Sequence, residues 1–365
     1  MEVTNHDWPN LDGWWESHVD QFRPIVANTE APVLDANWLN DQWANTDDWW
    51  ASYLSTNRST LISDTSTALD ERSFGDSWTE LDSWWRTYSD ARQEDVEELL
   101  AAMNAADDMW ASDPSQFDTD PLAADWQTAQ GFTGPIRLNR EEDWSFALAD
   151  LFRSQEGVLT SELFDTTRKE TPNSVETEAH LPGGSETTRY EDILINLPGG
   201  GISIEVKVGD TSLQKTVETA GLVERHYSGD WTHVLLLPAY QHSQLQSAFG
   251  EALTQPADGP PIITETPFGN REVEVEVRNW QEVSLALRVI LQRTEKLSPH
   301  WAASAYVVCT LIEQRILGFT PKPLVERLAA TDDVVNDDVS LSVSIGDIES
   351  QISHLQKTTE EIKHE

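Results

Sequence analysis

The stretch RYEDILINLPGGGISIEVKV, residues 189–208, carries the pattern that decides the fold of this chain. Apolar and polar residues alternate in the run 188–196 and again in 201–208, and Leu-Pro-Gly-Gly-Gly at 197–201 lies between the two runs. Alternation with a period of two is typical of β-strands, and a Pro-Gly-rich break between two such runs is typical of a hairpin turn. The stretch therefore predicts two neighbouring antiparallel strands.

The residues on either side of this hairpin extend it to a mixed α/β core. A third alternating run covers 174–181, and apolar residues at helical spacing predict a helix over 141–155. After the hairpin, a helix is expected over 211–227 and a buried strand over 231–238. The predicted order is helix, three strands, helix, strand.

The C-terminal part of the chain is expected to complete this core and to end in an amphipathic helix. The expected elements are a helix near 241–253, a charged strand at 272–278, and helices near 280–296, 299–318 and 321–330. Apolar residues then follow a short heptad stripe at Leu341, Ile345, Ile348, Ile352, Leu355 and Ile362. Such a stripe predicts either a helix packed on its own domain or a coiled-coil homodimer.

The chain before residue 131 repeats itself every 35 residues and holds twelve of the 16 Trp residues. Trp8, Trp43 and Trp78 share one position of the repeat. A period of this size is typical of two-helix units that bury their apolar faces by stacking on each other. We expect an all-α, Trp-rich repeat region in which the Trp residues pack between repeats, with partner binding or base stacking as alternatives.

These patterns divide the chain into four segments. The first boundary is the Gly- and Pro-containing stretch GFTGP that begins at Gly131. The predicted segments are the helical repeats at 1–130, the α/β core at 131–260, a strand and helices completing the core at 261–335, and a tail helix at 336–365.

The charge balance is strongly acidic, with 64 Asp and Glu against 24 Lys and Arg and a formal net charge of −40. So much like charge strains a compact state in dilute buffer, but at molar ionic strength the Debye length falls to roughly 3 Å and the repulsion is screened. The 16 Trp residues and a hydrophobic fraction of 38% provide enough apolar surface for folding. We expect a salt-adapted protein from the cytoplasm of a halophilic archaeon.

The cysteine content and the hydropathy of the sequence indicate the cellular compartment. The single cysteine, Cys309, excludes an internal disulfide and a cysteine-based zinc site. The N-terminus has no basic stretch followed by an apolar one, and no run approaches 18 apolar residues. A soluble, cytoplasmic protein without a membrane partner is expected.

Three charged residues of the hairpin carry the chemical signal. Glu205 and Lys207 lie two residues apart on one strand, so their side chains share a face, and Asp192 lies on the neighbouring strand. An acid two residues before a Lys is a weak motif, because it occurs again at Glu361 and Lys363. The strand context makes the difference, since charges inside a sheet are costly unless they are paired or coordinate a metal.

This arrangement resembles the PD-(D/E)xK nuclease superfamily over roughly residues 136–255. The resemblance implies a restriction-endonuclease-like αβββαβ core and a divalent cation, Mg²⁺ or Mn²⁺, bound by Asp192 and Glu205. It also implies that Lys207 orients or activates the attacking water. The chain departs from the motif name at Glu191, which stands where the name has Pro.

The resemblance further implies a metal-binding Glu at the start of the first helix. Glu142, followed by Asp-Trp-Ser, matches the usual sequence of the family at that point, whereas a helical wheel places Glu141 closer to the apolar stripe. We take Glu142 as the candidate. The helix after the motif often faces substrate in this family, so Gln214 and Lys215 are candidates for contact with nucleic acid.

The function implied is metal-dependent hydrolysis of phosphodiester bonds in DNA. A partner protein bound through the N-terminal repeats is a further expectation. The alternative is a non-catalytic adaptor, in which the repeats bind a protein and the nuclease-like core is only a scaffold.

Overall fold

The computed structural model describes residues 93–111, 116–126, 136–137, 140–153, 157–164, 171–182, 189–209, 213–257, 259–267, 271–330 and 345–363. The chain divides into two compact units, Met1–Ser83 and Trp84–Glu365, and every described residue belongs to the second. The predicted repeats before residue 93 therefore lie outside the described residues.

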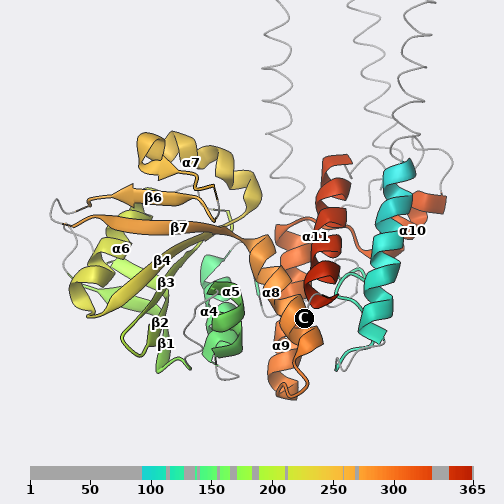
Figure 1. Ribbon diagram of the computed structural model, residues 1–365, viewed down its shortest axis with the longest axis horizontal. Helices are drawn as coiled ribbons and strands as arrows, with labels where there is room; N and C mark the ends of the chain where they lie inside the picture. The colour runs from blue at the N-terminus through green and yellow to red at the C-terminus, as the bar shows by residue number, and fades with distance from the viewer. Residues whose placement is uncertain are drawn as a thin grey trace, which may run out of the picture. The chain divides into compact units, whose positions relative to one another are not determined.

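Seven strands in the described part of the chain form one sheet (Figure 1). They are β1 (Ser174–Leu181), β2 (Arg189–Leu197), β3 (Gly200–Val206), β4 (Asp230–Leu237), β5 (Leu253–Thr254), β6 (Ile262–Glu265) and β7 (Val273–Asn279). Their order in the sheet is β1-β2-β3-β4-β7-β6-β5. The pairs β3-β4 and β4-β7 are parallel, and the other neighbours are antiparallel.

Helices cover both faces of this sheet and form a separate group beside it (Figure 1). They are α4 (Glu141–Arg153), α5 (Val158–Phe164), α6 (Lys215–His226), α7 (His242–Phe249), α8 (Trp280–Arg293), α9 (Pro299–Leu311), α10 (Lys322–Ala330) and α11 (Ile345–Lys363). Short helices are η2 (Ala239–Gln241), η3 (Gly250–Ala252) and the π-helix η4 (Ile312–Ile316), and a further helix covers 93–111. The helix α6 packs on one face of the sheet, and α4 and α8 pack on the other.

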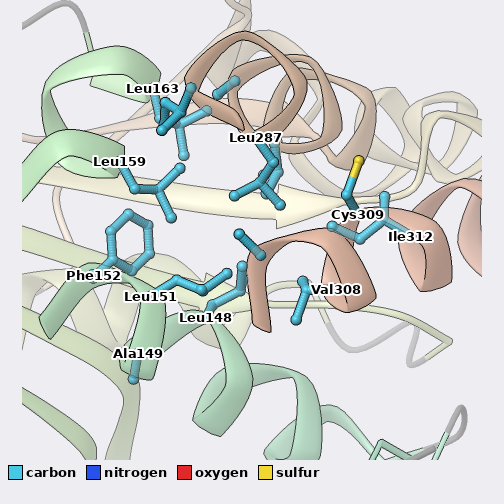
Figure 2. Close-up of a cluster of buried hydrophobic side chains, with 14 of the residues drawn as sticks. Leu148, Ala149, Leu151, Phe152, Leu159, Leu163, Leu287, Val308, Cys309 and Ile312 are labelled. Carbon is cyan, nitrogen blue, oxygen red and sulfur yellow. The ribbon is translucent and has the colours of Figure 1, made fainter. Parts of the chain in front are cut away.

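The largest apolar core lies between the sheet and the helices α4, α5, α8 and α9. Figure 2 shows part of it, where Leu148 and Phe152 of α4 approach Leu287 of α8 and Val308 of α9. Because helices cover both faces, β3 is buried along nearly its whole length. This explains why its sequence is so apolar and why charged residues near its end stand out.

The turn between β2 and β3 requires glycine at two positions. Gly199 adopts a φ of +90°, which side chains rarely tolerate, and a Cβ atom on Gly200 would clash with the backbone carbonyl of Asp230. The absence of side chains here allows β3 and β4 to begin close together. The Pro-Gly-rich hairpin predicted from the sequence is therefore confirmed.

The observed elements confirm the mixed α/β class. Their order follows the predicted helix, three strands, helix and strand, with α5 as an additional helix before β1. The expected single helix at 241–253 is wrong, because η2, α7 and η3 divide it and Gly250 ends α7 with a φ of +53°. The short strands β5 and β6 were not predicted. They extend the sheet beyond β7, where β6 pairs with it antiparallel.

The predicted boundary at 130/131 is also wrong, because the residues just before it pack into the same unit as the sheet. Trp110 is buried in the large core, where its ring meets Tyr306 of α9 edge-on with 5.8 Å between centroids. Asp120 forms a buried ion pair with Arg288 of α8. Gly131 and its neighbours form a local break in the sequence, which says nothing about what later helices bury.

Three of the six positions of the predicted heptad stripe are covered by the chain itself, and Leu341 lies outside the described residues. Ile348, Ile352 and Leu355 are buried in a second apolar cluster together with Leu99 of helix 93–111 and Val325 of α10. The alternative of packing on the same domain is therefore the one observed, and these positions are not available for a coiled-coil homodimer. None of the described helices combines the length and the hydrophobicity needed to cross a membrane.

Candidate active site

The carboxylate of Asp192 lies where the pairing between β2 and β3 stops. The last paired residues at this end are Ile193 and Ile204. Beyond them, the backbone N–H of Val206 donates to Asp192 Oδ2 at 2.8 Å. A side-chain oxygen thus takes the place of a main-chain acceptor, and this hydrogen bond orients the carboxylate towards the end of β3.

Lys207 follows β3 directly and is almost entirely buried, with 5% of its surface exposed. Its Nζ atom lies 2.9 Å from Glu205 Oε1 and 3.3 Å from Glu141 Oε2. Its backbone N–H donates to Leu236 of β4, and its carbonyl oxygen accepts from the indole N–H of Trp280 at 2.9 Å. Main chain and side chain are therefore both held by partners from other elements.

The first turn of α4 contributes Glu141 to this cluster. Glu141 Oε1 accepts from the backbone N–H of Val208 at 3.0 Å, while its other oxygen pairs with Lys207. Glu142 is exposed. The choice of Glu142 from the sequence is therefore corrected to Glu141, because Glu141 lies at helical spacing from the buried Ser145 and Glu142 is rotated out of that face.

Negative charge exceeds positive charge among these side chains. Burial and the nearby Glu205 carboxylate raise the pKa of Asp192 to about 7. The adjacent Glu191 is 2% exposed, and burial together with Glu205 and Asp192 raises its pKa strongly. Burial lowers the pKa of Lys207, but Glu205 and Glu141 outweigh it and raise that pKa above its ordinary value. An additional cation would relieve this repulsion.

The arrangement suits a sparsely coordinated metal rather than a closed cage. Within the described ranges, no group of three or more His, Cys, Asp or Glu side chains is placed to hold a metal ion. Mg²⁺ is commonly bound through one or two carboxylates, and water and substrate phosphates complete its shell. Asp192 and Glu205, whose charges act on each other, fit that kind of site.

The candidates for nucleic-acid contact, Gln214 and Lys215, are exposed at the start of α6. Because β3 and β4 are parallel, α6 returns the chain from the end of β3 to the start of β4. Its first residues therefore lie on the side of the sheet edge where Lys207 is found. Their contact with nucleic acid remains a prediction.

Sequence reasoning missed two aromatic residues that fix the main chain beside Lys207. Trp280 opens α8 directly after β7, and Tyr240 lies in η2 directly after β4. The Tyr240 hydroxyl donates to the carbonyl oxygen of Val208 at 2.9 Å. Neither residue belongs to a motif, and the available signal was the position of both after parallel strands, whose ends meet at one edge.

A buried network of polar side chains on β3, β4 and α6 was also not predicted. Ser203 shares a strand face with Glu205, and its hydroxyl lies 2.7 Å from His233 Nδ1 on β4. His233 Nε2 lies 3.5 Å from Glu224 of α6, which also pairs with Arg271. Ser203 is 2% exposed and His233 is 3% exposed, so this network is buried under α6 and is not accessible to a substrate.

Comparisons with known protein families, with curated proteins and with solved structures find no match to this chain.

Proposed function

We propose that the chain is a metal-dependent nuclease that hydrolyses phosphodiester bonds of DNA, with a restriction-endonuclease-like αβββαβ core. One observation carries the proposal. Asp192 and Glu205, on adjacent strands, converge with Lys207 at the end of β3, where Glu141 from the preceding helix joins them. The order of elements from α4 to β4 supports it, with α5 as an additional short helix.

The proposed cation is Mg²⁺ or Mn²⁺, held by Asp192 and Glu205. When bound, such an ion stabilises charge on the phosphate and lowers the pKa of a coordinated water. Lys207 donates hydrogen bonds from its ammonium group to the attacking water or to a phosphate oxygen. Its raised pKa favours the charged form, and a buried positive charge stabilises the negative charge that develops on the phosphate.

The neighbouring residues act by positioning these groups. Glu141 connects the Lys207 side chain to the backbone of Val208, and Trp280 holds the Lys207 carbonyl. A displacement of about 1 Å at a reacting centre can lower a rate about 100-fold. The proposed reaction therefore needs these contacts, because they hold Lys207 in place.

The proposal is tested by incubating the full chain with plasmid, linear and single-stranded DNA in molar KCl with Mg²⁺ or Mn²⁺. Molar salt is needed because the net charge is −40. We expect cleavage by the unmodified chain and a loss of at least about 100-fold in Lys207→Met, since loss of one buried electrostatic contact to a transition state has about this effect. Lys296→Met, which removes an exposed lysine, is the matched control and should cleave normally.

Metal binding provides a readout that does not need activity. Mg²⁺ at about 100 times its dissociation constant should raise the free energy of unfolding by about 2.7 kcal/mol. Asp192→Asn should lose most of this stabilisation, because one of two ligands is gone, whereas Lys207→Met should keep it. A folded chain that neither cleaves DNA nor gains stability from either cation would contradict the proposal and favour the adaptor alternative.

A further inference from the structure

Tyr240 places an exposed aromatic ring beside the proposed reacting centre. It is 63% exposed, yet its hydroxyl is anchored to the Val208 carbonyl oxygen at 2.9 Å. The N–H of the same Val208 donates to Glu141 at 3.0 Å. The backbone of one residue, next to Lys207, thus connects the ring to the charged cluster.

Packing among the described residues does not account for this ring. Large apolar side chains with exposed surface in the described residues are Phe146, Tyr190 and Tyr240, and Tyr240 is the most exposed of the three. Tyr190 has a ring partner in His180, with 5.6 Å between the ring centroids. Tyr240 instead is held by its hydroxyl while most of its surface faces solvent, which is the arrangement of an amphipathic contact residue.

We propose that Tyr240 stacks on an unpaired base of the substrate and that the substrate of this site is single-stranded DNA. The inference rests on the proposed nuclease function and adds a substrate class to it. In a duplex, each base is covered on both faces by its neighbours. A protein ring can stack only on a base that has left that arrangement, and single strands offer such bases at every position.

The charge of the chain favours base contacts over phosphate contacts. With a net charge of −40 and few basic residues, the chain cannot derive most of its affinity from phosphates. Phosphate-based affinity also falls steeply with salt concentration, whereas stacking depends on the face of the base. A ring anchored at Val208, the residue after Lys207, would bind substrate at salt concentrations that weaken phosphate binding by basic patches.

The inference is tested by binding of fluorescent oligonucleotides to the full chain in molar KCl, with Ca²⁺ replacing Mg²⁺ to suppress cleavage. The ligands are a twelve-nucleotide oligothymidylate, an abasic sugar–phosphate strand of the same length, and a hairpin duplex. Alanine replacement of a stacking aromatic weakens binding by roughly 5- to 150-fold. We expect Tyr240→Ala to lose this factor on oligothymidylate and almost nothing on the abasic strand or the duplex.

Two further variants separate stacking from a structural effect. Tyr240→Phe keeps the ring but loses the hydroxyl anchor to Val208, so it should bind oligothymidylate more tightly than Tyr240→Ala does and less tightly than the unmodified chain. Phe146→Ala removes an exposed ring on α4 and should bind normally. Because stacking needs both partners, the preference of the unmodified chain for oligothymidylate over the abasic strand should largely disappear in Tyr240→Ala.

Equal affinity of Tyr240→Ala and the unmodified chain for oligothymidylate would overturn the inference, even if Lys207-dependent cleavage is found. A loss in Tyr240→Ala that is as large on the abasic strand would also overturn it, because the ring would then act without a base. Absence of both cleavage and binding with any DNA would instead refute the proposed nuclease function and the inference with it.

Discussion

Arg288 and Lys207 are both buried cations that contact two carboxylates, but their surroundings differ. Arg288 is fully buried and bonds Glu313 through Nε and Nη2 at 2.6 and 2.8 Å, while its terminal nitrogens also bond Asp120. Burial alone would raise the pKa of Glu313. The charge and the hydrogen bonds of Arg288 outweigh burial and keep this pKa far below its ordinary value. Around Lys207, by contrast, the pKa of Asp192 is raised.

The difference separates a cluster whose charges are balanced within the fold from one that fits the proposed metal-dependent reaction. The Arg288 cluster joins α8, the segment 116–126 and the π-helix η4, and His354 of α11 adds a contact to Glu313 at 3.1 Å. The guanidinium geometry satisfies several oxygens at once. The Lys207 cluster has an excess of carboxylates at the C-terminal end of β3, and the pKa of Asp192 is raised there. Groups with strongly shifted pKa values are typical of functional sites.

The largest expected effect is on stability when the balanced cluster is broken. Arg288→Met leaves Asp120 and Glu313 buried without their main partner and should lower the free energy of unfolding by about 3–5 kcal/mol. Urea denaturation in molar KCl, followed by far-UV circular dichroism, measures this. Arg137→Met is the matched control, because the Arg137 side chain is 63% exposed where it pairs with Asp143, and its loss should change the free energy of unfolding only slightly. Similar losses in both variants would mean that the buried Arg288 cluster stabilises the fold no more than an exposed ion pair does.

At acidic pH, we expect an intermediate effect on the free energy of unfolding, caused by His233. Burial, together with the Arg271 charge, lowers the pKa of His233 to about 4. The unfolded chain, with a histidine pKa of about 6.5, therefore binds more protons than the folded chain between pH 6.5 and pH 4. The stability linked to His233 is fully present above pH 6.5 and is lost as the pH falls towards 4.

We expect this linkage to contribute about 2 kcal/mol between pH 7 and pH 5. His233→Gln removes the titrating group, so the unmodified chain should lose about that much more stability than the variant over this range. Denaturation curves for the two proteins at matched pH values give the difference. Parallel pH profiles would show that His233 takes up its proton equally in the folded and unfolded states.

The smallest expected effect is that of Asp192→Asn in the Lys207 cluster, and its sign is opposite to that of a charge removal in the Arg288 cluster. Asp192→Asn replaces a carboxylate among carboxylates by a neutral group of similar shape, and should stabilise the metal-free protein by about 1 kcal/mol at pH 8. Glu313→Gln removes the charge that balances Arg288 and should destabilise by a larger amount. Metal-free urea denaturation compares the two. Destabilisation by both substitutions would mean that the Lys207 cluster is as well satisfied as the Arg288 cluster.

Several features of this protein follow from local sequence. The alternation in 174–181 and 189–208, interrupted by glycines, predicted the three-stranded meander, because strand periodicity and turns depend on neighbours in the chain. The same alternation placed Glu205 beside Lys207, and the hairpin brought Asp192 to the neighbouring strand. The central part of the candidate site was thus accessible from one short stretch.

Other features were decided only by the tertiary structure. Glu141 and Glu142 are adjacent in the sequence, where the helical wheel favoured Glu141 and the family resemblance favoured Glu142. The packing of α4 on the sheet brings Glu141 to Lys207. Arg288 and Asp120 are 168 residues apart, and their pairing joins the segment before residue 131 to the unit that contains the sheet.

Tyr240 lies beside the site for a similar reason, because β3 and β4 are parallel and end at the same edge. Periodicity and turn composition report on what each residue does along its own segment. Which charge is buried, paired or left in excess depends on the distant segment that covers it, and a single sequence does not state that partner.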